Sequence, residues 1–172
     1  MTSPIVNLDD LAFMPRPPDR APTGAAAERY EATVAFIGPR VGAKKLGYNI
    51  TAVPSGKRAF PFHSHQVNEE MFFILQGSGE LRLGAETFPV RQGDFIACPA
   101  GGPETAHQLV NTGQDELRYL AVSTRLSPDI AEYPETGRFG LLAEVAPKPD
   151  GTPRVMMFIG REDQSLPYWE GA

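Results

Sequence analysis

The amino-acid sequence predicts an all-β fold, a sandwich or a barrel, in a single domain. Between residues 46 and 124, short apolar segments follow one another at even spacing, and turn residues separate them. The chain holds 17 glycines and 17 prolines among 172 residues, enough for many turns, while 41% of the residues are hydrophobic, enough for a core. Long amphipathic helices do not interrupt the segments, so the pattern favours antiparallel strands over a parallel α/β sheet.

The first part of the chain predicts an extended arm. Residues 14–23 contain four prolines, which exclude a regular helix and a central strand. Residues 24–33 fit either a short helix or an edge strand. We expect three regions: residues 1–45 form an N-terminal arm that packs on or extends the barrel, residues 46–125 form its core, and residues 126–172 form a C-terminal extension with a late strand.

Eight strands are predicted for the core, each bounded by glycine, proline or another turn residue. They span residues 46–53, 59–65, 70–75, 79–83, 86–90, 94–97, 107–111 and 117–124. Beyond the core, residues 126–133 are expected to hold one turn of helix, and residues 155–159 are the late strand.

Charge and composition argue against several classes of function. The net charge is −5 and the sequence has no lysine or arginine cluster, which argues against a nucleic-acid partner. The longest apolar run, residues 71–75, is far too short to span a membrane. Cys98 is the single cysteine, so no internal disulfide can form, and the first residues lack the pattern of a signal peptide. We expect a cytoplasmic protein without a membrane partner.

The three histidines lie close together in the sequence. His63 and His65 are two apart on a predicted strand, which places both side chains on one face, roughly 7 Å apart at the usual rise per residue. Glu70 opens the next strand and His107 opens another. A single histidine is usually a surface or core residue, but all three fall within 45 residues, at strand ends. Three imidazoles and a carboxylate are ligands typical of Fe, Mn, Co, Ni, Cu or Zn rather than Ca or Mg.

Two stretches of the sequence resemble the two motifs of the cupin family. The first reads Gly56…His63-Ser-His65-x4-Glu70-x6-Gly77, and the second reads Gly93-x5-Pro99-x-Gly101…His107-x3-Asn111. The resemblance implies a double-stranded β-helix, or jelly-roll, barrel of about six to eight strands that is often dimeric. It also implies that one divalent transition metal binds four side chains: His63, His65, Glu70 and His107.

The loops depart from the usual motifs at two places. Six residues separate Gly56 from His63 where five are usual, and the loop 101–107 is about three residues longer than the minimal version. The six residues before Gly77 favour Glu70 over Glu69 as the ligand. The glycine- and proline-rich loop and the aromatic C-terminal end are similar to small single-domain bacterial cupins that carry the label sugar-phosphate isomerase.

The implied ligand set suggests a working metal rather than a structural one. Four protein ligands leave one or two positions open on a metal that prefers five or six. An open position suits isomerisation of a sugar or sugar phosphate, hydrolysis or lyase chemistry, or an Fe(II)-dependent dioxygenase. We expect first an isomerase acting on a small polar metabolite, second a dioxygenase, and third a non-catalytic cupin that binds a small ligand.

Substrate contacts and partners follow from the same set. With all three histidines engaged as ligands, no histidine is left as general base, and the catalytic residue stays unassigned. The candidates for substrate contact are Tyr48 on a preceding strand, Arg58 as a phosphate ligand, and Phe72 at the pocket floor. The expected partners are a small-molecule substrate or ligand and a second copy of the chain, in a homodimer.

Overall fold

Strands dominate the computed structural model, which describes residues 3–171. Helical structure in this range is limited to α1 (Ala25–Arg29) and four short 3₁₀ segments. The strands are β1 (Met14–Pro15), β2 (Thr33–Phe36), β3 (Leu46–Val53), β4 (Ser64–His65), β5 (Glu70–Gln76), β6 (Ser78–Leu83), β7 (Glu86–Arg91), β8 (Phe95–Cys98), β9 (His107–Val110), β10 (Leu117–Thr124), β11 (Asp129–Tyr133), β12 (Arg138–Val145) and β13 (Arg154–Gly160).

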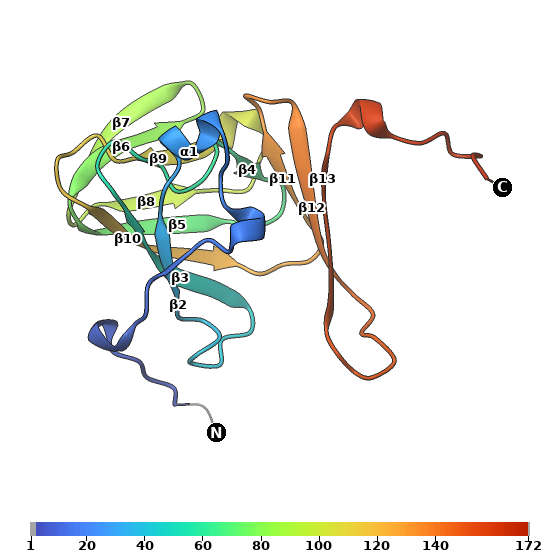
Figure 1. Ribbon diagram of the computed structural model, residues 1–172, viewed down its shortest axis with the longest axis horizontal. Helices are drawn as coiled ribbons and strands as arrows, with labels where there is room; N and C mark the ends of the chain where they lie inside the picture. Colours follow the sequence, from blue (N-terminus) through green and yellow to red (C-terminus); the bar gives the residue numbers. More distant parts are fainter. Residues whose placement is uncertain (1–2, 172) are drawn as a thin grey trace.

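The strands form an antiparallel barrel with two walls (Figure 1). One wall is a six-stranded sheet in the order β1-β2-β3-β10-β5-β8. The other consists of two smaller sheets, β7-β6-β9 and β13-β12-β11-β4. Backbone hydrogen bonds from His63 N to His107 O, at 3.2 Å, and from His107 N to His63 O, at 2.7 Å, join these two sheets. The expected all-β jelly-roll barrel is therefore confirmed, and two of its histidines sit at the seam of the second wall.

The core follows from period-two alternation along the strands of the large sheet. On β10, Leu117, Tyr119 and Ala121 are buried and alternate with partly exposed neighbours. Phe72 and Ile74 do the same on β5, and they pack with buried side chains of β6, β8 and β9. Because successive side chains of a strand point to opposite faces of the sheet, these alternating apolar residues all point into the barrel and form its core. The polar metal-ligand candidates lie at the start of β5 and β9.

Two motif residues explain why the turns of the barrel have their shape. Gly77 joins β5 to β6 with φ +81°, and a Cβ on it would lie 2.6 Å from the carbonyl oxygen of Glu116, so only glycine fits without a shift. Asn111 is fully buried and donates through Nδ2 to the carbonyls of Val53 and Asp115, at 2.8 and 2.9 Å. Its side chain thereby ties the turn after β9 to β3.

The chain before β3 contains both structures that its sequence allowed. Residues 24–33 include the helix α1 and the first residue of β2. The proline-rich stretch is mostly irregular, but Met14 and Pro15 pair with Val34 and Thr33 at the edge of the large sheet.

Two sequence expectations are wrong. The strand expected over residues 59–65 is regular only at β4, because Arg58 and His63 form isolated bridges and the carbonyl of Phe60 accepts from the side chain of Gln108. The helical turn expected within residues 126–133 is instead strand β11, which pairs with β4 on one side and β12 on the other. Strand β12 was not expected at all. Its partners β11 and β13 supply the pairing that its own sequence does not signal.

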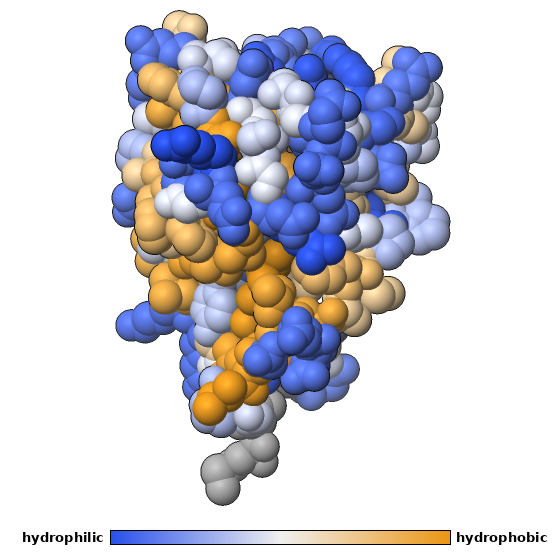
Figure 2. Space-filling model, turned by 90° about the vertical axis from the view of Figure 1, so that its left-hand side faces the viewer, coloured by the Kyte–Doolittle hydropathy of each residue, from blue (hydrophilic) through white to orange (hydrophobic). Residues whose placement is uncertain are grey.

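Apolar side chains are also exposed on the surface. Figure 2 shows a band of hydrophobic surface across one face of the molecule. Phe95 is 75% exposed on β8 and lies 4.4 Å, between ring centres, from Phe73 of β5. The apolar residues of β13 are 41–55% exposed along the edge of the four-stranded sheet. Within residues 3–171, the structure contains no helix long and apolar enough to cross a membrane.

Candidate metal centre

Three side chains from three strand ends meet inside the barrel. The ligand atoms of His63, Glu70 and His107 all lie within 4.8 Å of one another. Glu70 Oε2 is 2.9 Å from Nε2 of His107 and 3.8 Å from Nε2 of His63. His65 stands beside this group, with its Nε2 also 3.8 Å from Glu70 Oε2. One carboxylate oxygen is therefore the point on which the Nε2 atoms of all three imidazoles converge.

The opposite ring nitrogen of each histidine faces an acceptor. Nδ1 of His63 lies 2.9 Å from the carbonyl oxygen of Pro61, and Nδ1 of His107 lies 3.2 Å from that of Thr105. Nδ1 of His65 lies 2.7 Å from Oδ2 of Asp129. An Nδ1–H that donates to such a group leaves Nε2 as the ligand atom and raises its basicity. The donor set of three nitrogens and one carboxylate thus fits a borderline divalent metal.

Strand pairing explains why these residues come together. His63 and His107 face each other across the seam of the second wall, while His65 pairs with Ala131 of β11. Glu70 lies at the first position of β5, between Cys98 of β8 and Ser123 of β10. Glu69 is exposed, since the alternation of β5 turns it away from the barrel.

Asp129 is a residue of the site that the sequence did not reveal. It is 4% exposed, and its Oδ1 accepts from the backbone N–H of Val67 at 3.1 Å while Oδ2 faces His65. A carboxylate so placed orients His65 and also closes the turn before Glu70. No motif marks this position, because the expectation of a helical turn hid the strand that Asp129 opens.

The electrostatics of the site follow from burial and from the contacts of His107 with Cys98 and Glu70. Burial alone would lower the pKa of His107, but the contacts with Cys98 and Glu70 outweigh it and raise that pKa to about 10. Burial alone would likewise raise the pKa of Glu70, but the hydrogen bond with His107 and the nearby imidazoles bring it below its usual value. Burial, followed by the proximity of His107, lowers the pKa of His63 to about 4. His63 is therefore neutral at pH 7, and His107 and Glu70 form an ion pair.

A cavity of about 420 Å³ adjoins the site. Glu70, His65 and Asp129 line it, as do Tyr48 and Asn49 of β3. Asn49 accepts from the hydroxyl of Thr51 through Oδ1 at 2.8 Å, so its Nδ2 carries the donors of that side chain. Apolar residues of β2, β12 and β13 form part of the rim: Phe36, Leu142 and Val155. The cavity is large enough for a small polar metabolite.

The three candidates for substrate contact occupy different places. Tyr48 lines the cavity beside Glu70. Arg58 lies in the irregular segment before β4, where its backbone bridges to Tyr30 and Val110, and it is not among the residues that line this cavity. Phe72 is buried between His107 and Tyr119, at ring distances of 5.6 and 5.4 Å. It packs in the core beneath His107 rather than along the cavity.

Comparison with known proteins agrees with this architecture. The family model of the cupin domain matches residues 49–123. An uncharacterized protein of Methanocaldococcus jannaschii is 38% identical over 71 residues, which are 41% of this chain and 54% of that protein. The oxalate-binding protein of Thermotoga maritima is 32% identical over 60 residues, 35% of this chain and 47% of that protein. The chain thus spans about half the length of these two curated relatives.

The solved structures extend the likeness beyond the matched motifs. A sugar phosphate isomerase of the cupin superfamily from Silicibacter pomeroyi superimposes with a TM-score of 0.73. The match covers 96% of this chain and 98% of the other, at 22% sequence identity. At this identity the likeness shows a shared fold, which includes the segments on both sides of residues 49–123.

Proposed function

With residues 49–123 forming the domain of a small cupin, we propose that this chain is a metal-dependent isomerase of a sugar or sugar phosphate. One divalent transition metal would bind His63, His65, Glu70 and His107. The observation that carries the proposal is the convergence of three imidazole Nε2 atoms on Glu70, each ring fixed by an acceptor at Nδ1, beside a cavity of about 420 Å³. The name of the Silicibacter pomeroyi protein gives the reaction class its support.

In such a reaction the metal and the residues that line the cavity would have different roles. When bound, the metal supplies a Lewis acid that polarises a carbonyl or hydroxyl group of the substrate. Asn49 would donate from Nδ2 to a substrate hydroxyl, and Tyr48, which also lines the cavity, would contact the substrate. The apolar rim would exclude water from the reacting carbons. The residue that moves the proton between those carbons is left unassigned.

A ligand-binding protein without catalysis is the second candidate. The observation that favours it is the match to the oxalate-binding protein of Thermotoga maritima, which is 32% identical over 60 residues. In that case the same cavity and ligands would hold a small polar anion and release it unchanged.

One set of measurements separates these functions. We expect purified full-length protein to contain about one transition metal per chain, measured by mass spectrometry of the elements, and to interconvert an aldose and a ketose, or their phosphates, in NMR assays. Tight binding of a ligand without turnover would favour the second candidate. Bound iron with substrate-dependent oxygen consumption would instead identify the dioxygenase considered from the sequence. A protein that takes up no metal would contradict all metal-dependent functions.

We further propose that the protein is a cytoplasmic homodimer. Phe95, which is exposed on the large sheet and packs against the half-buried Phe73, supports a contact between copies. The lone, buried Cys98 suits a reducing compartment. A monomeric sedimentation profile at micromolar concentration would contradict the dimer, and fractionation of the cells that make the protein would test the location.

A further inference from the structure

Arg16 reaches from the N-terminal arm to the barrel. It follows β1 and stands between two prolines, Pro15 and Pro17, which hold the arm extended. Its Nη2 donates to the carbonyl oxygen of Ala59 at 2.7 Å, and its Cζ lies 4.6 Å from the ring centre of Phe60. Both contacts are made with the irregular segment that leads into His63. A side chain of the N-terminal arm is therefore held against the core segment that leads into His63.

Aromatic residues connect Arg16 to the metal-ligand candidates. The ring of Phe60 lies 6.4 Å from that of His63, and the ring of Tyr133 stacks on His63 at 6.2 Å. The charge of Arg16 acts on the hydroxyls of both Tyr133 and Tyr119, and the hydroxyl of Tyr119 also experiences the charge of Glu70. Phe60 thus lies between Arg16 and His63, the nearest of the metal-ligand candidates.

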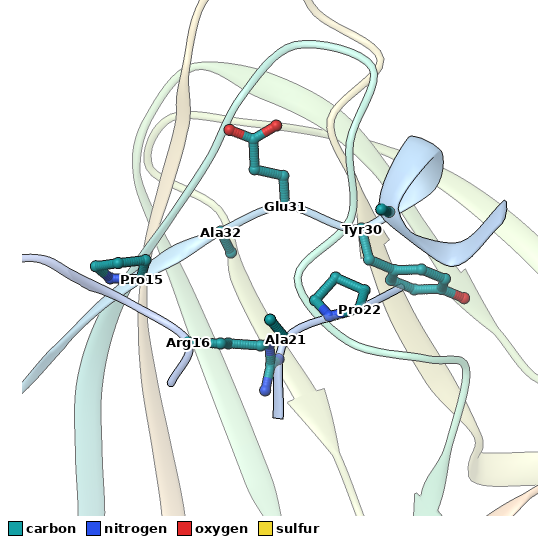
Figure 3. Close-up of a pocket in the computed structure, with 8 residues that line it drawn as sticks. Pro15, Arg16, Ala21, Pro22, Tyr30, Glu31 and Ala32 are labelled. Atoms are coloured by element: carbon teal, nitrogen blue, oxygen red, sulfur yellow. The ribbon is translucent and has the colours of Figure 1, made fainter. Parts of the chain in front are cut away.

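The guanidinium has no acidic partner within residues 3–171. Arg16 forms none of the ion pairs of this range, although it is half-buried. Glu31 lines the same open cavity of about 270 Å³ under the arm. Its carboxylate lies 3.8 Å from Nζ of Lys57, and Figure 3 shows it pointing away from Arg16. Burial accordingly lowers the pKa of Arg16, against the smaller effect of the two tyrosines.

A half-buried arginine with unused donors is a ready anion site. The guanidinium has five N–H donors in a planar fork, and the carbonyl of Ala59 takes one of them. Such a fork matches the oxygens of a phosphate group, and the match is strongest where water is partly excluded. A merely structural role, docking the arm on Ala59 and Phe60, would leave the other N–H donors of the guanidinium without a partner.

We propose that Arg16 binds the phosphate group of a phosphorylated substrate whose other end reaches the metal centre. This inference rests on the proposed function and makes it more specific: the substrate is a sugar phosphate rather than a free sugar. The N-terminal arm then belongs to the binding site, and the aromatic rings between Arg16 and His63 form the wall along which the carbon chain lies.

The test is calorimetric binding to the full-length protein. The probes are a pentose 5-phosphate, a hexose 6-phosphate, the two free sugars and inorganic phosphate. Three variants are compared: Arg16→Gln removes the charge but keeps a donor for Ala59, Arg16→Lys keeps the charge without the fork, and Arg20→Gln is a control. Arg20 lies on the same arm and is exposed, with Asp19 at 3.9 Å as its ion-pair partner. Metal content and thermal midpoint are measured on every sample.

We expect a sugar phosphate to bind the wild type more tightly than its free sugar. Arg16→Gln should lose about tenfold or more of that affinity, since a charged hydrogen bond contributes roughly 1.5–3 kcal/mol. Arg16→Lys should be intermediate, and Arg20→Gln should match the wild type. Metal content should be the same in all four proteins, because Arg16 is not a ligand.

Several results would overturn the inference. One is equal affinity of Arg16→Gln and the wild type for the phosphates, and another is a wild type that binds none of them or binds the free sugars equally well. A wild type that holds no metal would contradict the proposed function instead. The phosphate affinities of metal-free wild type and Arg16→Gln would then still decide the role of Arg16.

Discussion

The barrel core supplies all four proposed metal ligands, whereas the segments on either side supply groups that orient or surround them. His63, His65, Glu70 and His107 lie on or next to strands of the core. The flanking groups are Asp129, which faces His65, Tyr133, which stacks on His63, and Arg16, which lies beyond them. From this difference we expect that the core would determine whether a metal binds, and that the flanking segments would determine how tightly it binds and which substrate lies beside it.

The largest effect is expected from the two ligands at the seam of the second wall. Substituting His63→Ala or His107→Ala should abolish stoichiometric metal, because each removes one of the atoms that meet within 4.8 Å. Elemental analysis of purified protein measures this directly. Gln66→Ala, an exposed position between these ligands in sequence, is the control. Unchanged metal content in both histidine variants would place the metal outside the core.

Two adjacent carboxylates give the next comparison. Glu70→Gln should weaken metal binding by more than the roughly 100-fold that marks the upper range for groups around the ligands. Glu69→Gln should leave it unchanged, since Glu69 is exposed and Glu70 faces the three imidazoles. Competition with a chelator gives both affinities. A larger loss of metal affinity in Glu69→Gln than in Glu70→Gln would mean that β5 begins one residue earlier in the metal-bound protein.

The same division describes what could be predicted from the sequence. The core was accessible because its turns need particular residues: Gly77 takes a positive φ where a Cβ would meet a backbone oxygen, and Asn111 satisfies two buried carbonyls. These requirements fix the spacings between the motif residues, and those spacings can be recognised in the sequence. They also place Glu70 rather than Glu69 toward the imidazoles.

The flanks were not accessible in this way, because their roles depend on pairing between distant segments. Asp129 lies 64 residues from His65 and meets it only because β11 pairs with β4. The sequence around Asp129 by itself predicts a helical turn. Arg16 lies within residues 14–23, whose four prolines exclude a regular helix, but this proline pattern says nothing about where its side chain points.

Asp129 tests the contribution of the flank. Asp129→Asn should lower metal affinity by about 10- to 100-fold without abolishing binding, because the amide no longer presents a charged acceptor to Nδ1 of His65. Glu132→Gln is the matched control on the same strand, where the carboxylate accepts from Gln66 instead. Titration of a chelator-buffered metal measures both. A complete loss of metal in Asp129→Asn would show that Asp129 is as necessary for metal binding as the four core ligands, which would contradict the difference between core and flank.

Proton release gives the last and smallest comparison. The pKa of His107 is raised from about 6.5 to about 10, so at pH 7 this side chain holds a proton that a metal must displace. His63 releases none, because its pKa is lowered to about 4 and it is already neutral. Metal uptake near pH 7 should therefore release about one proton from the core, and the affinity should fall about tenfold for each pH unit of acidification.

Calorimetry in two buffers of different ionisation enthalpy counts that proton. Asp129→Asn should release the same number as the wild type, because the displaced proton belongs to the pair of His107 and Glu70, which Asp129 does not touch. Its affinity alone should differ. A different number of released protons in Asp129→Asn would show that Asp129 takes part in the titration of the core ligands. Core and flank would then differ in their position in the fold, but both would contribute to the protonation of the site.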